Sequence, residues 1–328
     1  MTALLFAGAL LLIAAASGLF TNAVEWAGHL LQLGAGATGS LLAAFGTALP
    51  ETMVVVVALL GGASDRDQIA TGAVLGSSFL LVTLGGAVTG VAVLSRSRSR
   101  NLEVDAEQVR RDLGVFLTAF GCAVASTVLS HPERVVVGVL LLILYAGYAR
   151  STAGGAPRDG DAPEPLHIVR WRTGPPPGWV VGAQLAGATV LLAVGSALFV
   201  DAIHSAAVSL GWNALVLAVI AVPFATELPE TLNSVLWIRS GEDSLALGNV
   251  AGAMAFQACI LGFVGVTFTS WQLGASGLLS AGCAFVTGLY LLGLLRRGRT
   301  HGGWLLLAGL PWLGYLVAEL ATSGRLSL

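Results

Sequence analysis

Ten stretches of this 328-residue chain are almost free of charge over the length of a membrane-spanning helix. A helix needs about 20 consecutive apolar residues to cross the hydrocarbon core of a bilayer. The stretches cover roughly residues 3–31, 36–60, 68–94, 113–130, 134–150, 178–208, 213–237, 244–270, 275–295 and 303–321. We therefore predict an all-α polytopic membrane protein with ten transmembrane helices.

The distribution of charge excludes a water-soluble fold. Charged residues make up 10% of the chain, against about 25% in soluble globular domains. Of the 16 basic and 18 acidic residues, nine lie in residues 95–112 and seven in residues 150–172. The remainder are too few to cover a surface exposed to water. Soluble enzymes and nucleic-acid-binding proteins are therefore excluded.

The arginines orient the predicted bundle. With ten helices, the connections after the third, fifth, seventh and ninth helices share one side and hold 13 of the 16 basic residues. The opposite side holds Arg66, Arg134 and Arg325. Because positively charged loops stay in the cytoplasm, we predict an integral protein of the cell (plasma/inner) membrane with both termini outside the cytoplasm.

Two halves of the chain share three sequence blocks in the same order. We place the first half at residues 1–150, a cytoplasmic linker rich in glycine and proline at 151–177, and the second half at 178–328. The matched blocks are Ser17–Val24 with Ser196–Ile203, Leu49–Thr52 with Leu228–Thr231, and Gly72–Gly76 with Gly248–Gly252. In the first two pairs, the residue numbers of the two members differ by the same amount. In the third pair the difference is slightly smaller, because the connection that precedes the block is shorter in the second half. Three ordered matches indicate an internal duplication.

Each half contains five predicted helices, and this odd number makes the second half enter the membrane from the opposite side. Inverted repeats are typical of secondary transporters, whose substrate site lies near the midplane on interrupted helices. Pro50 and Pro229 mark such interruptions, because proline lacks an N–H and clashes with the preceding turn. The carbonyl groups freed there are tolerated only where they are buried or line a cavity, and there they can ligate a cation.

Two carboxylates directly follow these prolines. Glu51 and Glu230 lie about halfway along their spans, at equivalent positions of the two halves. An acid inside a membrane span is costly and therefore indicates function. Hard cations such as Ca²⁺ bind carboxylate and carbonyl oxygens, and Thr47 and Thr226 add hydroxyl groups one turn earlier on the same face. These four residues are candidate cation ligands.

Other acids within the predicted spans differ in position. Glu227 is three residues before Glu230 and lies on nearly the same helix face, so it is either a third ligand or a proton carrier. Glu25, Asp201 and Glu319 lie toward the ends of their helices, near water, and we expect them to lie outside the site.

The motifs around these acids resemble those of the sodium/calcium exchanger branch of the calcium/cation antiporter superfamily. They are Gly46–Glu51 (GTALPE), Thr71–Ser78 (TGAVLGSS), Ala225–Glu230 (ATELPE) and Leu247–Met254 (LGNVAGAM). The resemblance covers nearly the whole chain. It implies two five-helix halves around central ion sites, with the helices at 3–31 and 178–208 sliding across the core to alternate access.

The resemblance also implies which residues bind ions. The ion ligands that it implies are Glu51 and Glu230, whose carboxylates would serve both Ca²⁺ and Na⁺, together with oxygens of Thr47, Thr226 and Ser77 and the backbone carbonyls of Ala44 and Pro223. The chain departs from the family pattern at Ala48, Leu81, Glu227, Ala253 and Gln257. Small polar groups of the kind that build sodium sites are lost, whereas Glu227 and Gln257 join the candidate ligands.

We therefore predict a secondary active antiporter that exchanges Ca²⁺ against Na⁺ by alternating access. The alternative is a proton-coupled exchanger (Ca²⁺/H⁺ or Na⁺/H⁺) on the same scaffold, favoured by Glu227 because neighbouring carboxylates promote proton binding. A third hypothesis is a membrane protein that binds cations without transporting them. An intramembrane enzyme is disfavoured, since the spans hold no H-E-x-x-H or G-x-S-x-G motif. We expect a monomeric transport unit without cofactors or nucleic-acid partners, in contact with inorganic cations and the lipid bilayer.

Overall fold

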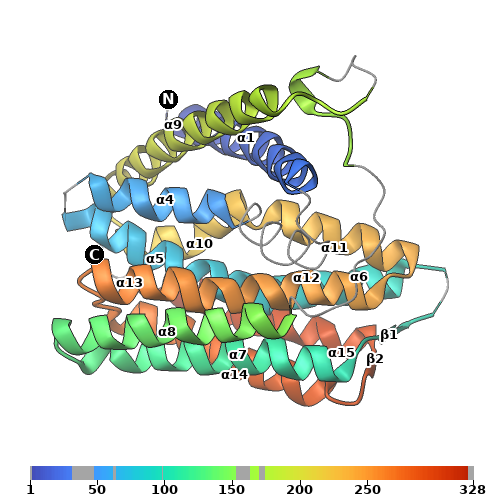
Figure 1. The fold of residues 1–328 in the computed structure, drawn as a ribbon. Coiled ribbons are helices and arrows are strands. Elements are labelled where there is room, and N and C mark those ends of the chain that lie inside the picture. Colours follow the sequence, from blue (N-terminus) through green and yellow to red (C-terminus); the bar gives the residue numbers. More distant parts are fainter. Residues whose placement is uncertain are drawn as a thin grey trace.

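The chain is described by a computed structural model that covers residues 2–31, 48–61, 64–97, 99–152, 163–169 and 174–323. Within these residues the fold is helical apart from one short pair of strands (Figure 1). The α-helices are α1 Thr2–Leu30, α4 Leu49–Leu60, α5 Ser64–Leu80, α6 Gly86–Ser95, α7 Ala106–Ala125, α8 His131–Thr152, α9 Gly178–Leu210, α10 Ala214–Thr226, α11 Leu228–Ser240, α12 Asp243–Phe256, α13 Gly262–Phe268, α14 Gly274–Leu295, α15 Gly302–Leu306 and α16 Leu310–Ser323. Strands β1 (Asn101–Glu103) and β2 (Arg299–His301) pair antiparallel.

Most of the predicted spans are present as single helical segments. Within the described residues, eight segments are long and apolar enough to cross a membrane. A ninth span is formed if α10 and α11 are counted together, although the two helices are bent by 46° at the break between them. Of the predicted span at 36–60, only the part that forms α4 lies within the described residues.

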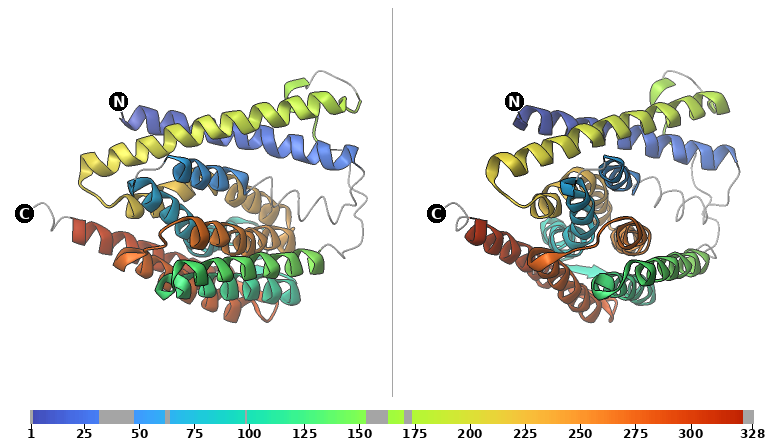
Figure 2. Two further views of the ribbon diagram at one scale, coloured as in Figure 1. Left: turned by 60° about the vertical axis from the view of Figure 1, so that its left-hand side comes forward. Right: turned by 90° about the vertical axis from the view of Figure 1, so that its left-hand side faces the viewer.

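The helices form two layers. Helices α1 and α9 pack along each other and lie across one face of the remaining bundle (Figures 1 and 2). Within the bundle, α5 packs against α10 and α4, and α7, α8 and α14 lie on the side away from α1 and α9. Helix α1 begins and α16 ends at one end of the bundle, whereas the β1–β2 pair lies at the other end.

Two glycines let α5 and α10 approach to backbone contact. A Cβ atom at Gly72 would lie 2.5 Å from the carbonyl oxygen of Leu215, and one at Gly76 would lie 2.6 Å from that of Val219. Small residues four positions apart commonly form such close interfaces between membrane helices. The contact fixes the position of Ser77, the residue after Gly76, relative to the C-terminal end of α10.

Two π-helical segments interrupt the helices at corresponding places. Leu81–Gly85 separates α5 from α6, and Gln257–Leu261 separates α12 from α13. Their first residues are related by the same offset in residue number as the matched glycine blocks. Single-turn π segments occur frequently at functional sites because they change the direction of side chains along the helix. The structure thus repeats an irregular feature that the sequence pattern did not predict.

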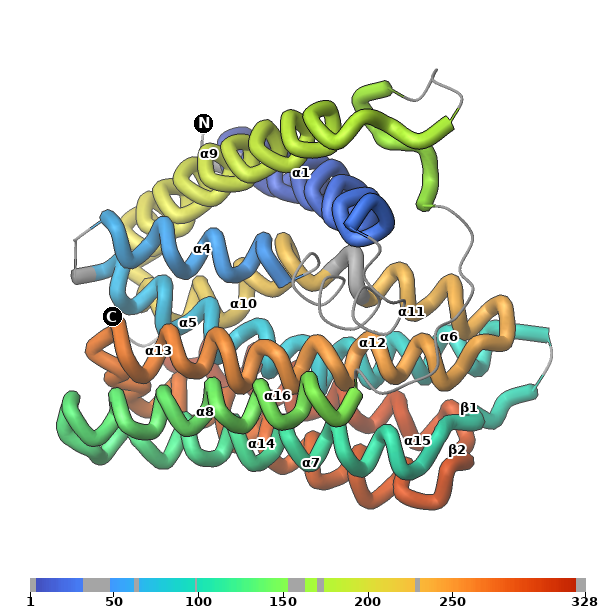
Figure 3. Tube along the Cα trace, in the orientation of Figure 1, coloured from blue at the N-terminus to red at the C-terminus, as the bar shows by residue number. Residues whose placement is uncertain are grey.

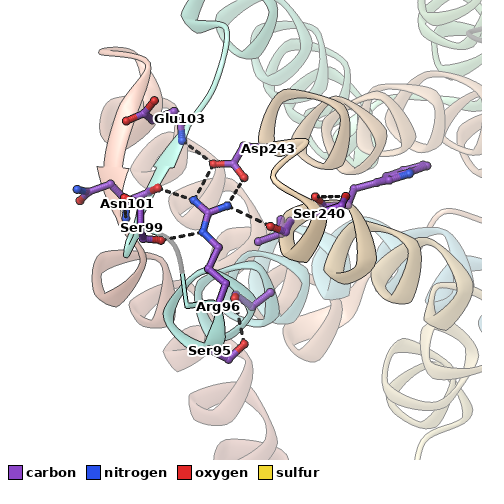
Figure 4. A network of polar contacts seen from close by, with 10 residues as sticks. Ser95, Arg96, Ser99, Asn101, Glu103, Ser240 and Asp243 are labelled. Carbon is purple, nitrogen blue, oxygen red and sulfur yellow. Dashed lines mark hydrogen bonds and ion pairs between the residues drawn. The ribbon is translucent and has the colours of Figure 1, made fainter.

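A buried arginine joins the two halves at the end of the bundle that carries the strands. Arg96, just after α6, contacts both carboxylate oxygens of Asp243 at the start of α12, with Nη–Oδ distances of 2.5 and 3.0 Å (Figure 4). Its N–H groups also donate to the carbonyl oxygens of Ser99, Asn101 and Ile238 at 2.7–3.1 Å. The guanidinium group is therefore paired on every side.

Candidate cation site

Helix breaks of the same geometry precede the two prolines predicted to interrupt the spans. Ala48 has φ −88° and ψ 3°, and Glu227, its counterpart in the second half, has φ −95° and ψ −6°. The next helix begins after each of them, with proline at its second position. Helix α4 and helix α11 extend from this central region toward opposite ends of the bundle (Figure 3).

A threonine stabilises each break in the same way. The Thr52 hydroxyl donates to the carbonyl oxygen of Ala48 at 2.7 Å, and the Thr231 hydroxyl donates to that of Glu227 at 2.9 Å. The two threonines are the last residues of the matched L-P-E-T blocks. Since a proline cannot donate the backbone hydrogen bond of a regular helix, these hydroxyl groups add partners at the interrupted turn.

Two carboxylates at these breaks lie within hydrogen-bonding distance of the same side-chain amide. The Gln257 side-chain nitrogen lies 2.8 Å from a carboxylate oxygen of Glu227 and 3.5 Å from one of Glu51. Each of the three residues is only 1% exposed. They come from three elements: Glu51 from α4, Glu227 from the α10–α11 break, and Gln257 from the π segment after α12.

Two hydroxyl groups complete the described part of this cluster. The Thr226 hydroxyl lies 3.4 Å from the Glu227 carboxylate and 3.3 Å from the carbonyl oxygen of Val222. Ser77 on α5 is fully buried near the same carboxylate, and its hydroxyl makes no hydrogen bond to the described residues. The structure therefore brings together five predicted site residues: Glu51, Ser77, Thr226, Glu227 and Gln257.

The other predicted ligands are placed less completely. Thr47 and Ala44 lie outside the described residues. Glu230 lies on the first turn of α11, and its side chain is likewise outside the described part of the structure. Pro223 is buried in α10, where its carbonyl oxygen accepts the N–H of Glu227 at 2.8 Å. That carbonyl retains a second lone pair for a ligand.

The described cluster differs between the two halves. When the halves are aligned on their matched blocks, Glu227 corresponds to Ala48 and Gln257 corresponds to Leu81. The two polar residues that lack a polar counterpart in the first half are hydrogen-bonded to each other. The polar groups that the second half adds therefore form one contact, Glu227 with Gln257. In the opposite sense, Ser77 of the first half corresponds to Ala253.

The chemistry of the cluster suits a cation. Among the side chains that the structure describes, the groups beside the Glu227 carboxylate are neutral: the Gln257 amide and the hydroxyls of Thr226 and Ser77. A buried carboxylate without a basic partner requires a bound cation or a proton. Among the described side chains, no group of three or more His, Cys, Asp and Glu residues could hold a metal ion. The oxygens gathered in the described cluster belong to carboxylate and hydroxyl groups, beside an amide whose nitrogen faces the carboxylates, and such oxygens suit a hard cation.

The acids predicted to lie outside the site do so. Asp201 on α9 is 60% exposed and pairs with Arg66 at the start of α5, with an Nη2–Oδ1 distance of 2.5 Å. Glu25 is exposed on α1. Glu319 on α16 lines a separate pocket with the start of α10, but it is buried, at 8% exposed, so the expectation that it lies near water is wrong.

The sequence reasoning missed two buried acids: Asp243, whose pairing with Arg96 is described above, and Asp112. Asp112 on α7 is 1% exposed, and the neighbouring Arg111 donates to it at 3.0 Å. The predicted span begins at residue 113, which assigns Asp112 to the charged loop. The amphipathic pattern of buried residues in α7, which continues back to Val109, is the signal that includes it.

These features together define a class of protein: a polytopic helical membrane protein with a buried cluster of acidic and polar side chains at its helix breaks. The family model described as "Sodium/calcium exchanger protein" matches residues 1–151 and 181–320. The chain belongs to this family, whose members are transporters of inorganic cations.

Two curated proteins are similar in sequence. The putative antiporter CaxA of Alkalimonas amylolytica is 28% identical over 293 residues, which cover 84% of this chain and 85% of CaxA. The inner membrane protein YrbG of Escherichia coli (strain K12) is 26% identical over 229 residues, or 68% of this chain and 66% of YrbG. The match to YrbG thus spans just under two thirds of that protein.

Solved structures share the fold. The H⁺/Ca²⁺ exchanger CAX superimposes with a TM-score of 0.79 at 17% identity, covering 96% of this chain and 82% of CAX. The sodium-calcium exchanger NCX_Mj gives a TM-score of 0.60 at 22% identity, with 97% of both chains covered. At these identities the similarity establishes the fold and leaves the coupling ion open.

Proposed function

We propose that this protein is a secondary active antiporter that exchanges Ca²⁺ against Na⁺ by alternating access. The observation that carries the proposal is the buried pair of carboxylates, Glu51 and Glu227, which share one amide donor at 3.5 and 2.8 Å. Two carboxylates held together in a membrane interior match the charge of one divalent ion.

The ligand set proposed for the ions combines side-chain and backbone oxygens. It comprises Glu51, Glu230, Thr47, Thr226, Ser77, Glu227, Gln257 and the carbonyls of Ala44 and Pro223. Ca²⁺ takes six to eight oxygen ligands in flexible geometry, and this set supplies them from both helix breaks. The matched backbone angles at Ala48 and Glu227 support two inverted repeats, residues 1–150 and 178–328, joined by the linker 151–177.

Alternating access in this proposal uses the two-layer arrangement. Helices α1 and α9 pack mainly on each other, so they can move together across the bundle that holds the site. The arginine-rich connections are proposed to be cytoplasmic and both termini to lie outside the cytoplasm. The transport unit is proposed to be a monomer without a cofactor.

Proton coupling is a second candidate, favoured by a specific observation. Glu227 has no ion-pair partner in the described part of the chain, and its contacts are with neutral groups. When the divalent ion leaves, binding of a single proton is enough to neutralise such a carboxylate. Exchange of Ca²⁺ for protons would then use Glu51 for ion binding and Glu227 for proton binding.

A flux assay separates these functions. Proteoliposomes that contain the full chain are loaded with Na⁺ or with acidic buffer, and ⁴⁵Ca²⁺ uptake is measured under each gradient. We expect Na⁺-driven uptake that Glu51→Gln abolishes. Asp201→Asn is the matched control, because it removes an equally charged group outside the cluster, and it should retain uptake. Uptake driven only by a pH gradient would show that the coupling ion is H⁺ and not Na⁺. Uptake unchanged in Glu51→Gln would refute the proposed cation site.

A further inference from the structure

The Gln257 amide occupies the space between the two carboxylates. Its nitrogen donates to Glu227 at 2.8 Å and to Glu51 at 3.5 Å. A calcium ion lies about 2.3–2.6 Å from its oxygen ligands, so an ion bound by both carboxylates and this NH₂ group would compete for the same space. The ion and the amide nitrogen therefore exclude each other.

The other end of the same amide is an unused ligand. The Gln257 side-chain oxygen is buried and has no hydrogen-bond partner among the described residues. A buried acceptor without a partner is costly, and within a polar cluster it points to a missing donor or ion. The terminal torsion of glutamine is broad and roughly twofold, so a half-turn exchanges the positions of oxygen and nitrogen.

We propose that Gln257 is a switching ligand that sets the preference of the site for divalent ions. In the ion-free site its NH₂ group stands between Glu51 and Glu227 in place of a cation. When Ca²⁺ enters, the amide turns and presents its oxygen as a ligand. The inference rests on the proposed function, since it requires that Ca²⁺ binds between these carboxylates.

Selectivity follows from the turned state. Displacing the NH₂ group costs the same for any ion that enters, so this cost cancels in the ratio of two ion affinities. The carbonyl dipole that replaces it interacts more strongly with a divalent than with a monovalent ion, because ion–dipole energy scales with the ionic charge. Gln257 therefore raises the affinity for Ca²⁺ relative to Na⁺.

The structure offers a matched pair of variants. Gln257→Met removes both the donor and the acceptor with little change of volume. Leu81→Met makes a volume-conserving change at the equivalent position of the first half, the first residue of the other π segment. It is fully buried but apolar, so it controls for disturbance of a π segment.

Binding to the purified full chain tests the proposal. Calorimetry measures Ca²⁺ affinity and its competition by Na⁺, and thermal unfolding in chelator reports on the ion-free site. We expect Gln257→Met to lower the Ca²⁺/Na⁺ affinity ratio by about fivefold or more, the effect of one ligand. The same variant should lower the apparent Tm in chelator, whereas Leu81→Met should change neither quantity.

Each outcome has one meaning. If the unmodified protein binds no Ca²⁺, the proposed function fails. If it binds Ca²⁺ and Gln257→Met keeps the same affinity ratio, the switching ligand is refuted while the proposed function stands. If Gln257→Met does not fold, Gln257→Asn replaces it, because the shortened amide cannot reach both carboxylates. An unchanged affinity ratio in Gln257→Asn would equally overturn the proposal.

Discussion

Replacing Arg96 by methionine should destabilise the whole transporter. The side chains of Arg96 and Asp243 are each 7% exposed, and the guanidinium also holds three backbone carbonyl groups. Removing one partner of such a buried pair costs about 3–5 kcal/mol, because the remaining charge is left uncompensated. The unfolding entropy grows with chain length, so each kcal/mol shifts the Tm of a 328-residue chain by about 1.5 °C and the apparent Tm should fall by roughly 4–7 °C.

The assay compares this variant with an exposed ion pair in the same region. Detergent-solubilised protein is heated, and the folded fraction is measured by size-exclusion chromatography. Glu103→Gln breaks the contact with Arg299, whose atoms lie 3.4 Å apart on side chains that are 65% and 64% exposed. Such pairs contribute about 0–1 kcal/mol, so its Tm should hardly change.

A double variant sharpens the reasoning. Arg96→Met with Asp243→Leu removes both charges, and a buried pair replaced by apolar groups is often neutral in stability. The double variant should therefore be more stable than Arg96→Met alone. Equal losses of Tm for Arg96→Met and Glu103→Gln, or a double variant that is the least stable of all, would refute the assignment of Arg96 as a buried link between the halves.

Two further substitutions test the packing and the asymmetry of the site. Gly76→Ala places a methyl group 2.6 Å from a backbone oxygen of α10, so it should lower the apparent Tm and Ca²⁺ uptake, whereas Gly187→Ala, with open space around it, should preserve both. Glu227→Ala introduces the residue found at the equivalent Ala48. Because Glu227 is one of the two carboxylates proposed to hold Ca²⁺, the variant should lower Na⁺-driven Ca²⁺ uptake and lose any response to a pH gradient, and a pH response that survives would exclude Glu227 as the proton carrier.

The sequence predicts features that depend on position along one helix. Apolar runs predict the spans, because the length of a run alone decides whether a helix can cross a bilayer. The L-P-E motifs predict helix breaks at Pro50 and Pro229, and the structure begins α4 and α11 one residue before these prolines. The π segments were not predicted, because neither Leu81–Gly85 nor Gln257–Leu261 contains a proline, the residue from which the other helix breaks were predicted.

Contacts between distant segments lie beyond such reasoning. Glu51 and Gln257 are 206 residues apart, and the sequence names both as candidates without showing that they meet. Arg96 and Asp243 are 147 residues apart, and the sequence alone assigns each of them to a loop between spans. Their burial depends on how the end of α6 packs near the start of α12, which no periodicity within either segment encodes.

The two polar residues that the second half adds to the site, Glu227 and Gln257, are best understood as one unit. Without Gln257, the Glu227 carboxylate would keep, among the described residues, the hydroxyls of Thr226 and Ser77 as its polar neighbours in a fully buried position. Without Glu227, the contact left to the Gln257 nitrogen within the described part of the chain would be the 3.5 Å contact with Glu51, and an unsatisfied buried donor is costly. Each residue makes the burial of the other tolerable, and the first half places apolar Ala48 and Leu81 at both corresponding positions. A single substitution at either residue should therefore lower the apparent Tm more than exchanging both for their apolar counterparts.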